Sequence, residues 1–369
     1  MRLGFFTMPI HPLEKDWRQS LQEDREAFIL ADELGFVEGY VGEHATDKAE
    51  NISSCLMFIA TLVDATRAIK LGTGTVNLPN NHPAAVASQV AMLDHLLGGR
   101  FIFGISPGGL LSDAEVFGIL DADRRAMFRE SIDQILAIWS GEPPYNINGQ
   151  FWKISTERTY LAPIGQGILP KPFQRPHPPI VVTAVTPFST SVSDAGARGW
   201  DAISANFLLP MWVKSHWGKY VEGCGKIGRH PDPANWRVAK SIFVADDEAT
   251  AREYATAANS PYRYYYHQIV TKMKSSGRME LFKQSRDMAD DAVTPNYVLE
   301  NLVIHGTPEK VIDELLAFQE TVGDFGTLLY AGHDWRDRDL ARRSMVLMAE
   351  KVLPAINAAN VRSRTPASR

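Results

Sequence analysis

Short apolar runs, rich in β-branched and aromatic residues, alternate with amphipathic helical stretches along the whole chain. Runs of this kind predict buried strands, while apolar residues spaced three or four apart predict helices. The strand-like runs are 2–8, 37–43, 69–78, 100–106, 179–185, 201–207, 236–245 and 326–331. Because a helical stretch follows each of them, the pattern predicts an α/β protein of the (β/α)8 barrel type, also called a TIM barrel.

A doubly wound open sheet is the competing fold, and it needs a glycine-rich phosphate-binding turn after its first strand. The corresponding segment, MPIHPLEKDW, contains no glycine, so the barrel is favoured. A chain of 369 residues suits a single barrel, which we expect over 1–356. The small, polar and basic residues 357–369 are predicted to form a disordered tail.

Two segments interrupt the alternation and are expected to be insertions in the barrel. The first, about 140–178, is rich in Pro and Gly, and we expect a hairpin in it, with arms at 145–146 and 151–154 around Asn148-Gly149. The second, about 260–305, looks irregular and contains the aromatic run YRYYYHQ. Loops of this length are usually functional, so a lid over the barrel is expected there, against the alternative of a solvated or dimer-contact helix.

Charge and cysteine content exclude several classes of protein. The formal net charge is −5, without the basic excess of a nucleic-acid-binding protein. No apolar run is long enough to span a membrane, and the N-terminus lacks the pattern of a signal peptide. Two cysteines, Cys55 and Cys224, are too few for a disulfide framework or a cysteine metal site. A cytoplasmic protein that binds neither nucleic acid nor membrane is expected.

The histidines do not predict a metal site. His44, His82, His95 and His333 could converge, with Glu43 and Asp334 beside two of them, but no pair has the spacing that puts two ligands on one helix face. His82 and His95 are expected to be ordinary loop and helix residues. His44 differs, because the end of a strand presents it to the mouth of the barrel, and we expect it to be functional.

The carboxyl ends of the strands form the active-site face of such a barrel. They supply mostly apolar and small side chains, which suit a flat organic cofactor and an apolar substrate better than a metal. Backbone N–H groups around Ser106, Gly108 and Gly109 could approach an anion, as could the hydroxyls and helix start at Ser189, Thr190 and Ser191. Ordinary helix capping is the alternative for the latter segment. Together the two segments favour a cofactor that bears a phosphate.

Four segments in this order resemble the bacterial luciferase-like, flavin-dependent monooxygenase superfamily. They are Glu43-His44, LGTGTVNLPNNHP (71–83), GRFIFGISPGG (99–109) and VVTAVTPFSTS (181–191). The segments EHATDKAENI (43–52) and TLLYAGHDW (327–335) look most like the limonene and diketocamphane monooxygenase branch.

The resemblance implies a flavin, FMN, at the carboxyl ends of the strands. It places a non-proline cis peptide at Gly74-Thr75 and makes His44 the catalytic residue. The cofactor-binding positions that it implies are Gly74, Thr75, Ser106, Gly108, Gly109, Thr183, Ala184, Ser189, Thr190 and Ser191. Luciferases carry an Arg in the strand-four loop that pairs with the phosphate, and Pro107 stands there in this chain. Either Arg124 or Arg125 could reach back to replace it.

The activity implied is that of a two-component monooxygenase. Reduced FMN (FMNH2) from an NAD(P)H:flavin reductase would react with O2 to a C4a-peroxyflavin, which transfers one oxygen atom to a small apolar substrate by Baeyer–Villiger oxidation, hydroxylation or epoxidation. Phe6, Met8, Asn77 and Trp335 are expected to line the substrate pocket, and Tyr264, Tyr265, Tyr266 and His267 to lie in the lid. A homodimer is expected from the same resemblance. A deazaflavin-dependent hydride-transfer enzyme and a non-catalytic flavin-binding protein are the alternatives.

Overall fold

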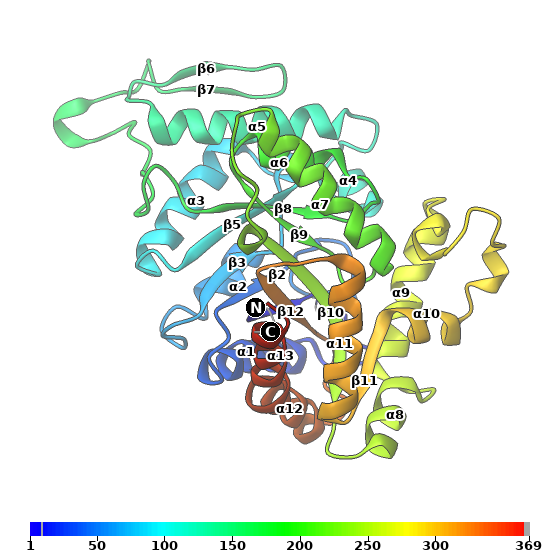
Figure 1. Ribbon diagram of the computed structural model, residues 1–369. Coiled ribbons are helices and arrows are strands. Elements are labelled where there is room, and N and C mark those ends of the chain that lie inside the picture. The colour runs from blue at the N-terminus through cyan, green and yellow to red at the C-terminus, as the bar shows by residue number, and fades with distance from the viewer. Residues whose placement is uncertain (9, 365–369) are drawn as a thin grey trace.

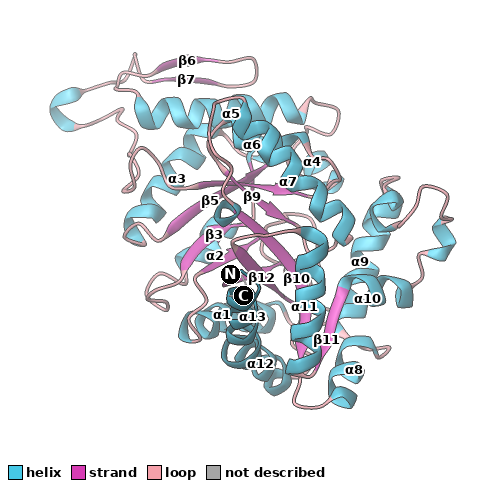
Figure 2. Ribbon diagram, in the orientation of Figure 1, coloured by secondary structure: helices cyan, strands magenta, loops and turns pink. Residues whose placement is uncertain are grey.

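The computed structural model describes residues 1–8 and 10–364 and is a closed barrel of eight parallel strands surrounded by helices (Figures 1 and 2). In order around the barrel the strands are β1 (Arg2–Thr7), β2 (Glu38–Val41), β3 (Lys70–Thr73), β5 (Phe101–Ser106), β8 (Ile180–Ala184), β9 (Asp201–Ser204), β10 (Trp236–Val244) and β12 (Thr327–Gly332). Pairing of β12 with β1 closes the ring. The predicted (β/α)8 fold is therefore confirmed.

The predicted helices form the outer layer, and local sequence signals set where they begin. The Asp16 carboxylate accepts a hydrogen bond from the backbone of Gln19 at the start of α1, and Pro83 opens α3. The helices that cover the barrel are α1 (Trp17–Glu33), α2 (Cys55–Ala60), α3 (Pro83–Leu96), α4 (Leu111–Val116), α5 (Arg124–Ser140), α6 (Thr190–Ala197), α7 (Pro210–Gly225), α8 (Glu248–Thr256), α11 (Pro308–Val322) and α12 (Arg338–Leu347).

Side chains of alternate strand residues fill the inside of the barrel. The inner cluster consists of Phe6, Tyr40, Ile102, Val181, Ile203, Ala239, Leu329 and Ala331, with Met8 packed against it. The amino ends of the strands are closed by a buried ion cluster, in which the Arg237 guanidinium binds both Glu38 and Asp201. The barrel is thus a packed core, and its carboxyl end is left for function.

The third predicted strand, 69–78, is divided into β3 and β4 (Val76–Asn77). The peptide bond Gly74–Thr75 between them is cis, as expected. A Cβ atom at Gly74 would lie 3.0 Å from Cβ of Tyr40 and 3.2 Å from the Phe6 ring. Glycine therefore lets the backbone lie close against the top of the inner cluster.

The hairpin in the first insertion is confirmed, but its register differs from the prediction. Strands β6 (Asn146–Asn148) and β7 (Lys153–Ser155) pair Asn148 with Lys153, so the loop is longer than an Asn-Gly turn. The Glu130 carboxylate on α5 accepts backbone hydrogen bonds from Gln150, Phe151 and Trp152 at 2.7 to 2.9 Å. This side-chain support from another element decides the turn.

The prediction of an irregular segment at 260–305 is wrong. It contains α9 (Pro261–Ser275), α10 (Pro295–Leu302) and a strand, β11 (Val303–Gly306), that pairs in parallel with the carboxyl-terminal half of β10. Buried residues on α9 recur at helical spacing, at Tyr262, Tyr265, Tyr266 and Ile269, whereas Tyr264 is half-buried and His267 exposed. The consecutive tyrosines mask this period in the sequence. Helix α9 is therefore a packed wall beside the mouth of the barrel.

The expected disordered tail also differs from the structure, because α13 (Leu353–Arg364) continues through residues 357–364. The Asn357 amide holds this helix to the first residue of the chain, accepting from the Met1 amino group at 2.7 Å and donating to its carbonyl at 3.0 Å. The rest of the predicted tail, 365–369, lies outside the described residues.

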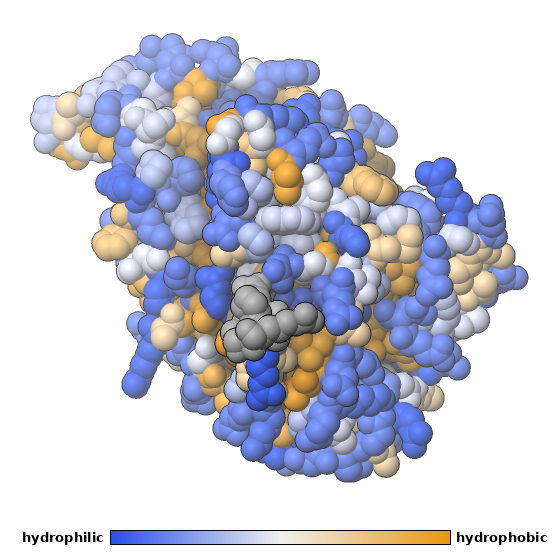
Figure 3. Space-filling view, in the orientation of Figure 1, coloured by the Kyte–Doolittle hydropathy of each residue, from blue (hydrophilic) through white to orange (hydrophobic). Residues whose placement is uncertain are grey.

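Hydrophilic side chains dominate the face drawn in Figure 3, with hydrophobic ones showing between them. Among residues 1–8 and 10–364, no helix combines the length and apolar character needed to cross a membrane.

Candidate active site

The carboxyl ends of β2, β3, β5 and β8 bring most of the predicted site residues to one side of the barrel mouth. His44 follows β2, and Gly74 and Thr75 separate β3 from β4. Ser106 ends β5, and Thr183 and Ala184 end β8. These positions are consecutive around the ring, so the predicted set forms one continuous surface.

A chain of hydrogen bonds holds these strand ends together. The Thr75 hydroxyl donates to Ser106 Oγ at 2.7 Å, and Ser106 donates to Asn77 Oδ1 at 2.8 Å. Asn77 in turn donates from its backbone to the Glu43 carboxylate at 3.1 Å. Burial raises the pKa of Glu43, although its hydrogen bonds from Cys55 oppose that shift. Asn77, predicted to line the substrate pocket, is thus bound into the frame of the mouth.

His44 lies at this mouth with its ring nitrogens facing two acidic side chains. Its Nδ1 is 2.8 Å from Asp113 Oδ2, on the short helix α4 after β5, and its Nε2 is 3.6 Å from Glu50 Oε2. Asp113 also accepts from the backbone of Ala45 and Thr46, which fixes the carboxylate. Burial disfavours the charged ring, but Glu50 and Asp113 outweigh it and raise the pKa of His44. The arrangement can hold a proton on the ring between the two carboxylates.

Two loops at the mouth have the form of an anion cradle. Gly108, in the loop after β5, adopts a φ of +78°, which a residue with a side chain rarely takes, and Gly109 is exposed. Ser189, at the start of α6, makes no side-chain capping bond, so its hydroxyl does not occupy the N–H groups of the first turn, the part of a helix that suits an anion. Thr190 is exposed and Ser191 half-buried beside them.

Helix α7 holds the second of these loops in place. His216 Nε2 donates to the Thr186 carbonyl at 2.8 Å, and the Ser215 hydroxyl accepts from the Phe188 N–H at 2.9 Å. Burial lowers the pKa of His216 to about 4, so the ring is neutral at pH 7. Phe188 has a φ of +50°, a strained conformation for a residue with a side chain. The two bonds from α7 preserve the loop shape that exposes the start of α6.

Arginines reach both loops. Arg124 Nη1 donates to the Gly108 carbonyl at 3.4 Å, whereas Arg125 is exposed, so Arg124 is the residue positioned to offset Pro107. Arg278, which no pattern in the sequence indicated, reaches the carbonyl of Val185 after β8 at 3.5 Å. Within the part of the chain that the structure describes, neither arginine forms an ion pair with a carboxylate. Their charges are therefore available to a bound anion.

The residues predicted to line the substrate pocket do not all lie together. Phe6 and Met8 form the floor of the mouth, and the Tyr265 hydroxyl contacts Met8 Sδ at 3.8 Å and Asn206 Oδ1 at 3.0 Å. Trp335 is elsewhere, lining a small cavity with Phe5 outside the inner cluster. Apolar side chains and a buried tyrosine thus bound the mouth on the side of α9.

The four histidines considered as metal ligands bind separate partners. His82 caps α3, His95 contacts the carbonyl of Lys171, and His44 faces Asp113. His333 Nε2 lies 3.1 Å from Ser241 Oγ, and burial lowers its pKa to about 3.

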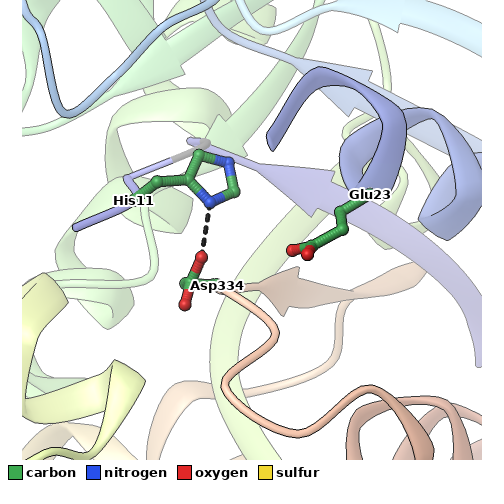
Figure 4. A group of neighbouring side chains, drawn as sticks. All are labelled: His11, Glu23 and Asp334. Atoms are coloured by element: carbon green, nitrogen blue, oxygen red, sulfur yellow. Dashed lines mark hydrogen bonds and ion pairs between the residues drawn. The ribbon is translucent and has the colours of Figure 1, made fainter. Parts of the chain in front are cut away.

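A separate cluster of His11, Glu23 and Asp334 ties the loop after β1 to the loop after β12 (Figure 4). His11 Nδ1 is 2.6 Å from Asp334 Oδ1, and its Nε2 is 3.0 Å from Asp24 Oδ2. The Lys15 ammonium contacts Glu23 and lies 2.6 Å from Asp334. Because an ammonium group already neutralises these carboxylates, the cluster is an ion network that clamps two loops.

The residues present at the mouth fit a flavin mononucleotide. Glycine at 74 lets the backbone lie close against Phe6 and Tyr40, and the N–H groups near Gly108 and at the start of α6 suit a phosphate. Arg124 and Arg278 add positive charge to those two loops. The fold and this site together define a barrel enzyme of the flavin-binding type.

Comparison with known proteins identifies the family. The family model for luciferase-like monooxygenases matches residues 1–324, so the chain belongs to that family. The chain is 34% identical to the 4-hydroxyprotoasukamycin monooxygenase of Streptomyces nodosus subsp. asukaensis, covering 96% of this chain and 92% of that protein. It is 30% identical to the limonene 1,2-monooxygenase of Rhodococcus erythropolis, covering 96% and 86%.

A solved structure agrees with these relatives. The oxygenating constituent of 3,6-diketocamphane monooxygenase from Pseudomonas putida, a type II Baeyer–Villiger monooxygenase in complex with FMN, has a TM-score of 0.85 at 25% identity, covering 96% of this chain and 98% of that one. The resemblance stated from the sequence is confirmed, and the protein is a flavin-dependent monooxygenase of the luciferase-like family.

Proposed function

We propose that this protein is the oxygenase component of a two-component, FMNH2-dependent monooxygenase that inserts one atom of O2 into a small apolar substrate. The observation that carries the proposal is the joint placement of an anion cradle after β5 and β8 and of His44, with two carboxylates, at the end of β2. A phosphate on one side and a proton donor on the other suit a cofactor laid across the mouth. Reduced FMN, when bound, supplies the electrons that activate O2.

Each part of the mouth has a separate task in this proposal. The residues that hold the cofactor are Gly74, Thr75, Ser106, Gly108, Gly109, Thr183, Ala184, Ser189, Thr190 and Ser191. Arg124 and Arg278 neutralise the phosphate, whose charge-assisted bonds are stronger than neutral ones. Phe6, Met8 and Tyr265 exclude water, which protects reactive species from side reactions. His44 is the catalytic residue and donates or orients a proton at Nε2.

The proposed function also requires a source of FMNH2 and suggests an oligomeric state and a compartment. The name "oxygenating constituent" of the Pseudomonas putida relative supports a separate NAD(P)H:flavin reductase as the source of FMNH2. Exposed apolar side chains on α2 and α3, Met57, Met92 and Leu96, support a homodimer. Cys55 and Cys224 are unpaired thiols, in keeping with the cytoplasm as the compartment. The oxidation is Baeyer–Villiger oxidation, hydroxylation or epoxidation.

Binding and oxygen uptake together test the proposal. Purified protein is titrated anaerobically with reduced FMN and with a reduced deazaflavin, and O2 uptake is then recorded with candidate ketones and alkenes. Tight binding of FMNH2 and substrate-dependent uptake are expected. Preference for the deazaflavin without O2 uptake would indicate hydride transfer instead. If His44→Ala keeps FMNH2 affinity and loses oxygenation, a purely flavin-binding role is excluded.

A further inference from the structure

The imidazole of His44 lies between two carboxylates that come from different segments. Asp113 on α4 lies 2.8 Å from Nδ1, and Glu50 in the loop after β2 lies 3.6 Å from Nε2. A neutral imidazole carries one N–H and one bare lone pair, so it can donate to only one of two carboxylates. With the Nδ1 hydrogen directed at Asp113, a neutral ring would turn its lone pair toward Glu50.

The Glu50 carboxylate is buried, so its negative charge needs opposite charges nearby. Its side chain is 1% exposed, and Oε2 has no hydrogen-bond partner among the described residues. The loop that carries it is fixed from two sides, by a β-bridge from Ile10 and by Asp47, which accepts the Glu50 N–H at 3.4 Å. A charge taken out of water is costly unless opposite charges face it. Those charges come from His44 and from Lys272.

Lys272 reaches Glu50 from helix α9. Its Nζ is 3.6 Å from Glu50 Oε2, and it forms an ion pair with Asp47. As a cation beside the same carboxylate, it opposes a second positive charge on His44. The charged and titratable groups that face the ring are thus Asp113, Glu50, Asp47, Lys272 and the neighbouring Glu43.

We propose that Glu50 is a positioning residue that keeps His44 protonated at Nε2, and that Lys272 on α9 sets the strength of that effect. The direction of the His44 pKa agrees, because burial lowers it, Glu50 and Asp113 raise it beyond that loss, and Lys272 lowers it. The ring is then a proton donor at Nε2, the nitrogen that lies 3.6 Å from Glu50. That the reaction uses this proton rests on the proposed function, whereas the charge of the ring does not.

Titration of His44 by NMR tests the inference without any cofactor. The full chain is labelled on its ten histidines, and the His44 signal is assigned by its loss in His44→Gln. Glu50→Gln is expected to lower the pKa of His44 by about one unit, since a charge at this distance shifts a pKa by one unit or more. Lys272→Met is expected to raise it. Glu142→Gln, at an exposed carboxylate, is the matched control and leaves it unchanged.

The opposite signs of the two variants separate this inference from a merely structural role. A pKa of His44 that does not fall in Glu50→Gln, or that falls in Lys272→Met, overturns it. If Glu50→Gln does not fold, two other variants test the inference. Glu50→Asp keeps the negative charge and is expected to keep the pKa of His44 raised. Lys272→Met is expected to raise that pKa further. The expected shifts in a protein that takes up no O2 with FMNH2 would refute the proposed function and leave the assignment of Glu50 intact.

Discussion

The His11 network sets a pH dependence of stability that can be worked out from its geometry. Only an imidazolium donates from both ring nitrogens, to Asp24 at 3.0 Å and to Asp334 at 2.6 Å. Burial disfavours that charge, but the two carboxylates outweigh burial and raise the pKa of His11 from 6.5 to about 9. Since one pKa unit corresponds to about 1.4 kcal/mol, the ion network is worth about 3 kcal/mol.

The sign follows from the raised pKa. In the unfolded chain His11 titrates near its ordinary value, so the extra stability is fully present below about pH 6.5. It declines as the pH rises and is lost once the pH passes about 9, where the folded protein also loses the proton. The clamp supports the mouth, because the backbone N–H of His11 donates to the carbonyl of Ala49, next to Glu50.

Urea unfolding at pH 6 and pH 10 measures this contribution when the protein is compared with His11→Gln. The variant can still form hydrogen bonds but cannot carry the charge. We expect the free energy of unfolding of the unchanged protein to fall by about 3 kcal/mol more than that of the variant between the two pH values. An equal fall in both proteins would show that His11 is not protonated in the fold.

Three further predictions concern the mouth and the barrel. Arg124→Met is expected to weaken FMN binding about tenfold or more, because a charge-assisted contact is lost. Arg125→Met is the control, and equal FMN affinities of the two variants in a fluorescence titration would refute the prediction. His216→Leu is expected to weaken FMN binding by losing the bond that shapes the β8–α6 loop, whereas His216→Gln, which keeps a donor, restores it; identical affinities of the two variants would contradict the role of that bond. Gly104→Ala would place Cβ 1.8 Å from a backbone oxygen of β3 and destabilise the barrel by about 3 kcal/mol or more. Gly218→Ala is the control, because its Cβ would meet open space. Similar melting temperatures of the two variants would refute the close packing at Gly104.

The barrel could be predicted from the sequence because its signal is local and repeated. Each buried strand is a short apolar run, and a helical stretch follows it in the sequence, so all eight units were found near their true bounds. The parts that were mispredicted depend on distant contacts. The loop of the hairpin is shaped by hydrogen bonds to Glu130 on α5. The C-terminal helix is held in place because its Asn357 hydrogen-bonds to Met1, the first residue of the chain.

The candidate site also has a part that the sequence predicted and a part that it did not. His44 was recognisable because a strand end carries it, and the loops around Gly108 and Ser189 because small residues follow strands. Asp113, Glu50 and Lys272 were missed, since their meeting at the imidazole depends on how α4, the loop after β2 and α9 pack. Lys272 had the least chance of discovery, because the tyrosines before it hid the period of its helix. The helical spacing becomes visible only with the structure, which buries Tyr262, Tyr265, Tyr266 and Ile269.

The central claim, that this barrel mouth performs oxygenation with reduced FMN, is tested most directly by stopped flow. Purified protein is loaded anaerobically with FMNH2, mixed with O2, and the flavin spectrum is followed in time, with free FMNH2 as the control. We expect a long-lived species whose absorbance is blue-shifted from oxidised FMN and whose decay responds to ketone or alkene substrates. Reoxidation at the rate of free FMNH2, with hydrogen peroxide release and no response to any substrate, would contradict it.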